Sequence, residues 1–292
     1  MDVAEQLARA GGIAGRRELV RASGRAGLAT AVANGDVLRV ARGRYALPTA
    51  SVAQQSAREL TGTAVLLSAA AHWGWRTKWQ PQRPQVAVGR GRKVAPQVRQ
   101  RVDVRWRSIP DAQVVDGWVT SRVRTVHDCC ALLPFDEALS VVDSALRDGQ
   151  VTRQQLLVLD HVPPRLRARV SRVVDAGDSR AANPFESVLR SVALGVAGLT
   201  VQPQVSIRDA DGWIGRVDLA DEALRVVLEA DSHEFHTDAA AFARDCWRYD
   251  RLVADDWLVL RFPWVHVMNR QAAIHALLTR VVARRLEGCR AA

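Results

Sequence analysis

Acidic residues interrupt two apolar runs between positions 217 and 231, and this pattern is the strongest local signal in the chain. The first run contains Asp218, a polar turn follows at 221–223, and the second run has the sequence LRVVLEAD. Successive side chains of a strand point to opposite faces, so Glu229 and Asp231 share one face. If the two runs pair as a hairpin, Asp218 lies near both. The pattern therefore predicts paired strands that carry three carboxylates at one end.

The residues around this hairpin predict the element order αβββαβα. Asn183 caps the first helix, Pro184 is its first residue, and Glu186 stands where a capping box places its carboxylate. Strands are expected at 201–207, 215–220, 224–231 and 258–262, and the later helices at 239–254 and 272–286. This part of the chain, residues 183–287, is predicted to form one domain.

Residues 1–49 have the pattern of three short helices followed by a two-stranded hairpin, with breaks at Gly11-Gly12, Ser23-Gly24 and Asn34-Gly35. This arrangement indicates a winged helix-turn-helix, in which the third helix enters the major groove of DNA. Arg25 would lie on that helix, and the wing would contact phosphates through Arg39, Arg42 and Arg44. A helical bundle that only contacts another protein is the alternative.

Residues 50–170 are expected to form an α/β middle domain, and 171–182 a linker or a helix end. Two strands, 85–89 and 102–107, flank a segment without acidic residues that contains Arg90, Arg92 and Lys93. This segment is either a phosphate-contacting arm or a solvated loop. Helices follow, with Ser121 and Thr152 as caps. Taken together, the fold class is α+β, with a winged helix, an α/β middle region and a C-terminal αβββαβ domain.

Charge is unevenly distributed along the 292 residues. The net charge is +10, yet residues 181–292 contain 13 Lys and Arg against 15 Asp and Glu, so the first 180 residues carry +12. A basic region attracts a polyanion, and double-stranded DNA is the partner that fits a basic module joined to an acidic site. An arginine-rich solvated surface would give the same count.

The remaining composition favours an intracellular protein. The four cysteines form no CxxC pair, the first residues contain Asp2 and Glu5 in place of an apolar signal core, and the longest apolar stretch is 64–71. A bilayer-spanning helix needs about 20 apolar residues. We therefore expect no membrane association and a cytoplasmic location, near the nucleoid if DNA is bound.

The chemistry predicted for the carboxylates is metal binding. Asp218, Glu229 and Asp231 repel one another and are costly to desolvate, and Mg²⁺ or Mn²⁺ removes that cost. Glu186 is a candidate fourth carboxylate, although its capping role explains it equally well. His236 could move a proton, with His233 as a second candidate and a structural role as the alternative.

One arginine of the 239–254 helix completes the candidate site. Arg248 lies on a stripe with Arg244 and Arg251 and could clamp a phosphate, while a solvated face with ion pairs is the alternative.

Residues 183–285 resemble the very-short-patch-repair-endonuclease-like branch of the PD-(D/E)XK nuclease superfamily. The resemblance rests on NPFE at 183–186, VDLA at 217–220, LEADSHEFH at 228–236 and RDCWRYDRLVADDWLVLRFPW at 244–264. It implies a restriction-endonuclease-like, Mg²⁺-dependent fold with Asp218, Glu229 and Asp231 as acidic site residues and His236 as the site histidine. The chain departs from the pattern at Asp231-Ser232, where the family has Asp-Gly, and in the longer interval to the histidine.

Residues 1–160 resemble AbiEi-family antitoxins, which are winged-helix regulators of their own operons. The matching segments are GDVLRVARGRYALP at 35–48 and GWVTSRVRTVHDCCALLPFDEAL at 117–139. This resemblance implies operator binding and a toxin partner, for which the residues themselves give no support.

Two functions from different classes follow. The first is a metal-dependent DNA endonuclease or nickase that acts in DNA repair or in defence against foreign DNA. Cutting both strands with one site per chain would require a homodimer. The second is a DNA-binding transcriptional regulator or antitoxin, without catalysis, in which the nuclease fold is degenerate.

Overall fold

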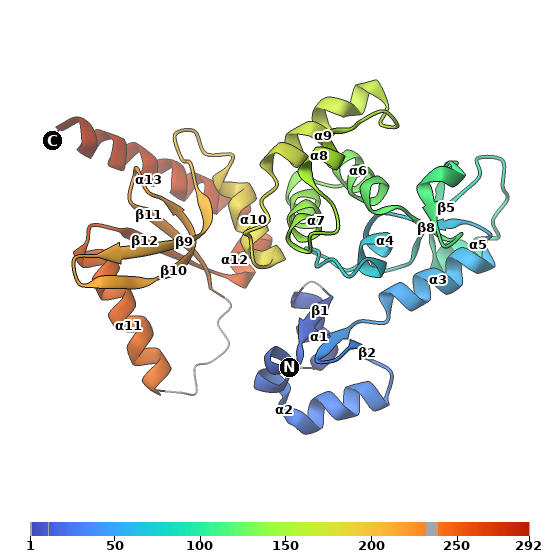
Figure 1. Ribbon diagram of the computed structural model, residues 1–292, viewed down its shortest axis with the longest axis horizontal. Coiled ribbons are helices and arrows are strands. Elements are labelled where there is room, and N and C mark those ends of the chain that lie inside the picture. Colours follow the sequence, from blue (N-terminus) through green and yellow to red (C-terminus); the bar gives the residue numbers. More distant parts are fainter. Residues whose placement is uncertain (1, 11, 232–238, 292) are drawn as a thin grey trace. The chain divides into compact units, whose positions relative to one another are not determined.

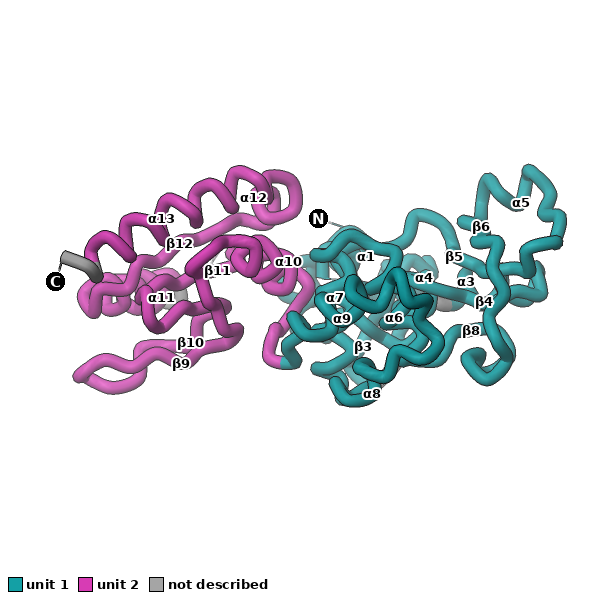
Figure 2. The backbone as a smooth tube through the Cα atoms, turned by 90° about the horizontal axis from the view of Figure 1, so that it is seen from above, with its two compact units in different colours: residues 1–179 teal, residues 180–292 magenta. Residues whose placement is uncertain are grey.

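A computed structural model describes residues 2–10, 12–231 and 239–291. These residues form a mixed α+β protein, which is the predicted class, and they contain three β-sheets. The chain divides into two compact units, residues 1–179 (unit 1) and 180–292 (unit 2), which Figure 2 distinguishes by colour. The division falls inside the predicted linker at 171–182. The two predicted domains 1–49 and 50–170 belong to the same compact unit.

The first part of unit 1 contains two helices and a small sheet. Its elements are α1 (Val3–Arg9), β1 (Ile13–Gly15), α2 (Arg16–Ala33), β2 (Leu38–Ala41) and β3 (Arg44–Ala46). The strands follow the order β1-β3-β2, and β1 was not predicted. A break at Gly24, with φ of 73°, divides α2 at the predicted helix boundary, and a positive φ of this kind favours glycine. Leu7, Leu19, Leu28 and Val37 form a buried core beneath these elements.

The rest of unit 1 surrounds a five-stranded sheet with the strand order β6-β5-β4-β8-β7. Its strands are β4 (Thr63–Ala64), β5 (Gln85–Val88), β6 (Asp103–Trp106), β7 (Val114–Val115) and β8 (Val119–Thr120). The helices are α3 (Thr49–Glu59), α4 (Leu66–His72), α5 (Pro96–Arg101), the 3₁₀ helix η1 (Asp111–Gln113), α6 (Arg122–Leu132), α7 (Phe135–Arg147), α8 (Arg153–Leu157) and α9 (Pro164–Ala176). Trp75 and Leu139 are among the large side chains that fill the core.

Unit 2 contains one mixed sheet with the strand order β12-β11-β10-β9. Its elements are α10 (Pro184–Ala193), β9 (Gln202–Asp209), β10 (Gly212–Asp221), β11 (Val226–Asp231), α11 (Ala239–Ala254), β12 (Leu258–Pro263), α12 (Trp264–Asn269) and α13 (Gln271–Ala291). The first three strands pair antiparallel, and β12 pairs parallel with β11. The predicted order αβββαβα is therefore observed, with the short α12 added between the last strand and the last helix.

Helices cover both faces of this sheet, as Figure 1 shows. On one face Val226 and Leu228 of β11 pack in a buried cluster with α10, α12 and α13. On the other face the intervening residue, Val227, packs against Leu252 of α11. The period of two along β11 therefore assigns its odd-numbered residues to the α11 side. Glu229, next in that odd series, is thereby directed toward α11.

None of the described helices combines the length and the apolar character that crossing a bilayer requires.

Candidate active site

The two carboxylates of the hairpin meet where β10 and β11 part. Regular pairing starts at Leu219 opposite Leu228. One residue before Leu219, the Asp218 carboxylate accepts the Ala230 N–H through Oδ2 at 2.9 Å, and the Asp218 N–H donates to Glu229 Oε2 at 3.3 Å. Each carboxylate thus accepts a backbone N–H of the opposite strand. These two hydrogen bonds hold the carboxylates side by side.

Burial makes this pair unusual in its protonation. Glu229 is 6% exposed, and desolvation, followed by repulsion from Asp218, raises its pKa to about 7. Desolvation also raises the pKa of Asp218, against the opposing effect of the Ala230 N–H. Two buried carboxyl groups in contact resist ionising together. The site consequently favours a proton or a cation between them.

Gln204 joins a third carboxylate to the pair. Its side-chain Nε2 donates to Glu186 Oε2 at 2.9 Å and lies 3.4 Å from Asp218 Oδ1. The Gln204 backbone has a φ of 57°, a conformation that few residues other than glycine adopt inside a strand. Such local strain is typical of positions whose side chain must point in an irregular direction.

Glu186 of α10 bonds both to the start of its own helix and to Gln204. Asn183 Oδ1 accepts the Glu186 N–H at 3.0 Å, and Asn183 Nδ2 donates to Glu186 Oε1 at 2.7 Å. The remaining oxygen, Oε2, accepts the Ala182 N–H at 2.9 Å as well as the Gln204 amide. The Asn183 side chain therefore caps α10, while the Glu186 carboxylate bonds to the residues just before the helix and to Gln204, and the described residues form no capping box here.

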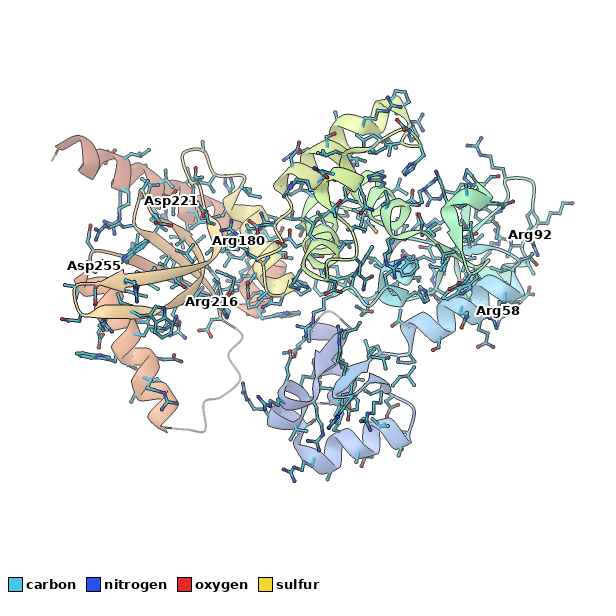
Figure 3. The ribbon with its side chains drawn as sticks, viewed as in Figure 1. Arg58, Arg92, Arg180, Arg216, Asp221 and Asp255 are labelled. Carbon is cyan, nitrogen blue, oxygen red and sulfur yellow. The ribbon has the colours of Figure 1, made fainter. Side chains whose placement is uncertain are left out.

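Arg248 of α11 neutralises Glu229. Its Nη1 lies 3.0 Å from Glu229 Oε1, and the same nitrogen is 3.4 Å from the backbone carbonyl of Arg216, which Figure 3 labels on β10. Its aliphatic portion passes over Gly215, where a Cβ would lie 2.8 Å from Arg248 Cδ. The Tyr249 hydroxyl accepts from Nη2 at 2.8 Å. The absence of a side chain at Gly215 thus lets the guanidinium reach the carboxylate.

Asp231 has a different partner. Its Oδ2 lies 2.6 Å from Nη2 of Arg261, a residue of the neighbouring strand β12. The structure thus joins Asp218, Glu229 and Glu186 in one network and pairs Asp231 with an arginine at its margin. Among the described residues, no group of three or more His, Cys, Asp or Glu side chains is arranged to hold a metal ion.

Asp218 and Glu229 nevertheless fit a divalent cation. Mg²⁺ in proteins is commonly held by one or two carboxylates, with water and substrate phosphate oxygens completing its octahedron. The two carboxylates are adjacent, and burial disfavours their simultaneous charge, which is the cost that a cation offsets.

The other predicted site residues fall into two groups. His233 and His236 lie in 232–238, outside the described residues. The arginines and the lysine predicted to contact DNA from unit 1 are all exposed, namely Arg25, Arg39, Arg42, Arg44, Arg90, Arg92 and Lys93. Figure 3 shows Arg92 on the loop that joins β5 to α5.

Three residues of the network were not predicted from the sequence, namely Gln204, Tyr249 and Arg261. Gln204 stands in the polar phase of an alternating strand, with Gln202 and Ser206 in the same phase, so no signal in the local sequence indicated it. The two others come from α11 and β12, and no local pattern distinguishes them from ordinary surface residues.

Comparisons with known proteins find a weak structural likeness. No protein-family model matches the chain, and no curated protein matches it. Among solved structures, the chain is similar to the crystal structure of the RV2827C protein from Mycobacterium tuberculosis, at 14% sequence identity over 71% of this chain and 87% of that chain, with a TM-score of 0.33. A likeness at this level carries no argument about fold or function.

Proposed function

We propose that the protein is a metal-dependent DNA endonuclease or nickase, with its active site at the β10–β11 end of unit 2. The observation that carries the proposal is the Asp218–Glu229 pair, two buried carboxylates from adjacent strands whose pKa values are both raised by desolvation. Groups perturbed in this way concentrate at functional sites. The order of helices and strands in unit 2 supports a restriction-endonuclease-like domain related to very-short-patch repair enzymes.

The residues of the network would divide the work of phosphodiester hydrolysis. Asp218 and Glu229 would hold Mg²⁺ or Mn²⁺, and Gln204 and the Ala230 N–H fix the direction of the Asp218 oxygens. A bound divalent cation supplies an acidified water and neutralises charge on the phosphate. His236 would take the proton that the attacking water loses as its oxygen bonds to phosphorus, and the sugar oxygen that leaves when one backbone P–O bond breaks would take a proton from solvent water. Glu186 holds Gln204 in place from the other side, and Asp231, paired with Arg261, lies at the margin of the pair.

Unit 1 would supply the affinity for duplex DNA. Arg39, Arg42 and Arg44 are exposed on or beside the β2–β3 hairpin, and Arg25 is exposed on the second segment of α2. This placement suits a winged helix with its wing on the phosphate backbone. Arg90, Arg92 and Lys93 extend the basic surface. Repair of damaged DNA and defence against foreign DNA both fit this design, in the cytoplasm near the nucleoid, and cutting both strands would need a homodimer.

A second function, a non-catalytic DNA-binding regulator or antitoxin, is favoured by a different observation. Both β11 carboxylates have arginine partners, since Arg248 binds Glu229 and Arg261 binds Asp231. Ion pairs of this kind can maintain a fold without any metal. In that case the winged helix would bind an operator, and a toxin would be its protein partner.

Cleavage of supercoiled plasmid by the purified protein separates the two functions. With Mg²⁺ or Mn²⁺ we expect nicked or linear product, and a loss of more than about a hundredfold in rate in Asp218→Asn and in Glu229→Gln. Glu222→Gln, in the exposed turn between the same strands, is the matched control and should cleave like the wild type. Cleavage that survives Glu229→Gln would contradict the proposed site, and an uncut plasmid with metal-independent retention of promoter DNA in a gel would favour the regulator.

A further inference from the structure

Tyr249 lies between two guanidinium groups that each hold a carboxylate of β11. The Cζ atoms of Arg248 and Arg261 are both 4.6 Å from the centroid of its ring. Arg248 pairs with Glu229 at 3.0 Å, and Arg261 pairs with Asp231 at 2.6 Å. Two cations beside one aromatic ring repel each other, so this arrangement depends on the two carboxylates for compensation.

The Arg248 guanidinium is incompletely satisfied in its position. Its Nε is buried and has no hydrogen-bond partner among the described residues, and Asp245 Oδ1 lies 4.0 Å from it. A buried donor without a protein partner is completed by water, by a ligand or by another conformation. Phosphate matches the planar fork of a guanidinium, because two of its oxygens accept two N–H groups in parallel.

Arg248 and a divalent cation compete for the same carboxylate. A cation held by Asp218 and Glu229 would lie close to the guanidinium that is now 3.0 Å from Glu229 Oε1. The cation and the guanidinium are both positive, and two positive charges beside one partly buried carboxylate repel each other strongly. Therefore either the guanidinium leaves Glu229 or an anion joins the site to compensate both cations.

We propose that Arg248 is the phosphate ligand of this site, and that Glu229 holds it only until a divalent cation takes its place. The inference rests on the proposed nuclease function and adds to it an order of events. The cation releases the guanidinium, which turns to a backbone phosphate of DNA while Tyr249 continues to support it. Metal and DNA then strengthen each other's binding by the same factor, as linkage requires.

The other arginines near the site suit this role less well. Arg261 pairs with Asp231, which the cation does not need. Arg251 binds Asp209 through Nε at 2.9 Å and also through Nη2, so it joins α11 to the β9–β10 hairpin. Arg251 is one turn away from Arg248 on the same helix, and Arg251→Gln is therefore a control matched in residue type and location.

The first test measures binding of Mn²⁺ to the full-length protein without DNA by titration calorimetry. Arg248→Gln should bind Mn²⁺ about tenfold more tightly than the wild type, because the competing guanidinium is gone. Arg248→Lys keeps a positive charge near Glu229 and should bind more weakly than Arg248→Gln. Arg251→Gln should match the wild type. Equal affinities in the wild type and Arg248→Gln would overturn the proposal.

The second test measures binding of a labelled DNA duplex in Ca²⁺, which occupies oxygen sites without supporting cleavage in the assay. The wild type and Arg251→Gln should bind the duplex about tenfold more tightly with Ca²⁺ than with EDTA, whereas Arg248→Gln should gain little. If Arg248→Gln does not fold, the linkage between Ca²⁺ and DNA binding is measured on the wild type alone. Its Ca²⁺ affinity must rise with DNA by the factor by which its DNA affinity rises with Ca²⁺, and independent binding of the two would overturn the proposal.

Glu229→Gln separates this inference from the proposed function. If Glu229→Gln abolishes metal binding while Arg248→Gln leaves both metal and DNA binding at wild-type values, the metal site stands and the role of Arg248 falls. If the wild type and Arg248→Gln bind no divalent cation at all, the proposed nuclease site falls and the inference falls with it.

Discussion

The carboxylate of Asp218 accepts the backbone N–H of Ala230 at 2.9 Å, directly beyond the point where β10 and β11 begin their regular pairing. A side chain thus supplies a hydrogen bond across the hairpin at the position where the strands separate. The bond holds Asp218 beside Glu229 and keeps both oxygens of the aspartate within the network. The irregular end of the hairpin is therefore the feature that builds the candidate site.

Glu229 should make unit 2 less stable as the pH rises. Its pKa is about 7 in the folded chain against about 4.5 when unfolded, so the folded state binds more protons between these values. The stabilisation is complete below pH 4.5 and is lost as the pH rises through 7. Denaturant unfolding at several pH values should show this slope in the wild type and in Glu222→Gln, but not in Glu229→Gln. The same slope in all three would refute the prediction.

His127 should give unit 1 the opposite dependence. It is fully buried, its Nε2 lies 2.8 Å from the Leu156 carbonyl, and its Nδ1 is 2.9 Å from Nε2 of His161. Burial lowers the pKa of His127 to about 4, so below about pH 6.5 the unfolded chain binds the proton first.

Acidification from pH 6.5 through pH 4 should therefore remove about 3 kcal/mol from the stability of unit 1. The stabilisation is fully present above pH 6.5. Calorimetric unfolding of His127→Gln should show a weaker pH dependence in this range, whereas the exposed His275→Gln of unit 2 should behave as the wild type. An unchanged acid sensitivity in His127→Gln would show that another group is responsible.

Gln204 should matter for the site more than for the fold. Gln204→Leu removes the amide that donates to Glu186 and Asp218, so the direction of the Asp218 oxygens is no longer fixed from β9. We expect cleavage to slow by about 10- to 100-fold and stability to fall by about 1 to 2 kcal/mol.

The neighbouring Gln202 provides the comparison for this variant. It is exposed on the same strand and bonds to Arg180, outside the network. Gln202→Leu should keep the wild-type rate of cleavage. A Gln204→Leu protein with full activity would show that Gln204 does not position the carboxylate.

The wing arginines should determine how DNA affinity depends on salt. Arg42→Ala together with Arg44→Ala removes two exposed cations from the β2–β3 hairpin, and each phosphate contact contributes about one unit to the slope of log K against log salt. We expect the slope to fall by about two for any duplex sequence. Arg280→Ala, an exposed arginine on α13 of unit 2, should leave the slope unchanged. Equal slopes for the wild type and the double variant would show that Arg42 and Arg44 do not contact DNA phosphates.

Capping residues and strong periodicity made much of the fold predictable. Ser121 caps α6 through its hydroxyl and Asn183 caps α10, both as expected, because these caps depend on local hydrogen bonds. The helix predicted at 239–254 has the same bounds in the structure. Helix α3 was missed, since its fully buried positions are the small residues Ala53 and Ala57, which give little apolar signal.

The candidate site was predictable only in part, because its members come together through tertiary structure. The period of two along one strand places Glu229 and Asp231 on one face, and pairing of adjacent strands brings Asp218 to Glu229 but leaves Asp231 with a different partner. The partner of Asp231 is Arg261, which reaches it through the parallel pairing of β11 with β12 and a separation of 30 residues. The positive φ of Gln204 could not be predicted, because a glutamine in the sequence does not indicate this backbone conformation.

The buried carboxylate pair also makes unit 2 a sensor for its own ligand. Asp218 and Glu229 oppose each other's ionisation, so a cation that binds between them stabilises the folded state. The melting temperature of unit 2 should therefore rise with the concentration of that cation. Unit 1 has a separate core, so its transition would stay in place as an internal reference. A panel of divalent ions could therefore be ranked by thermal unfolding alone, before any reaction is observed.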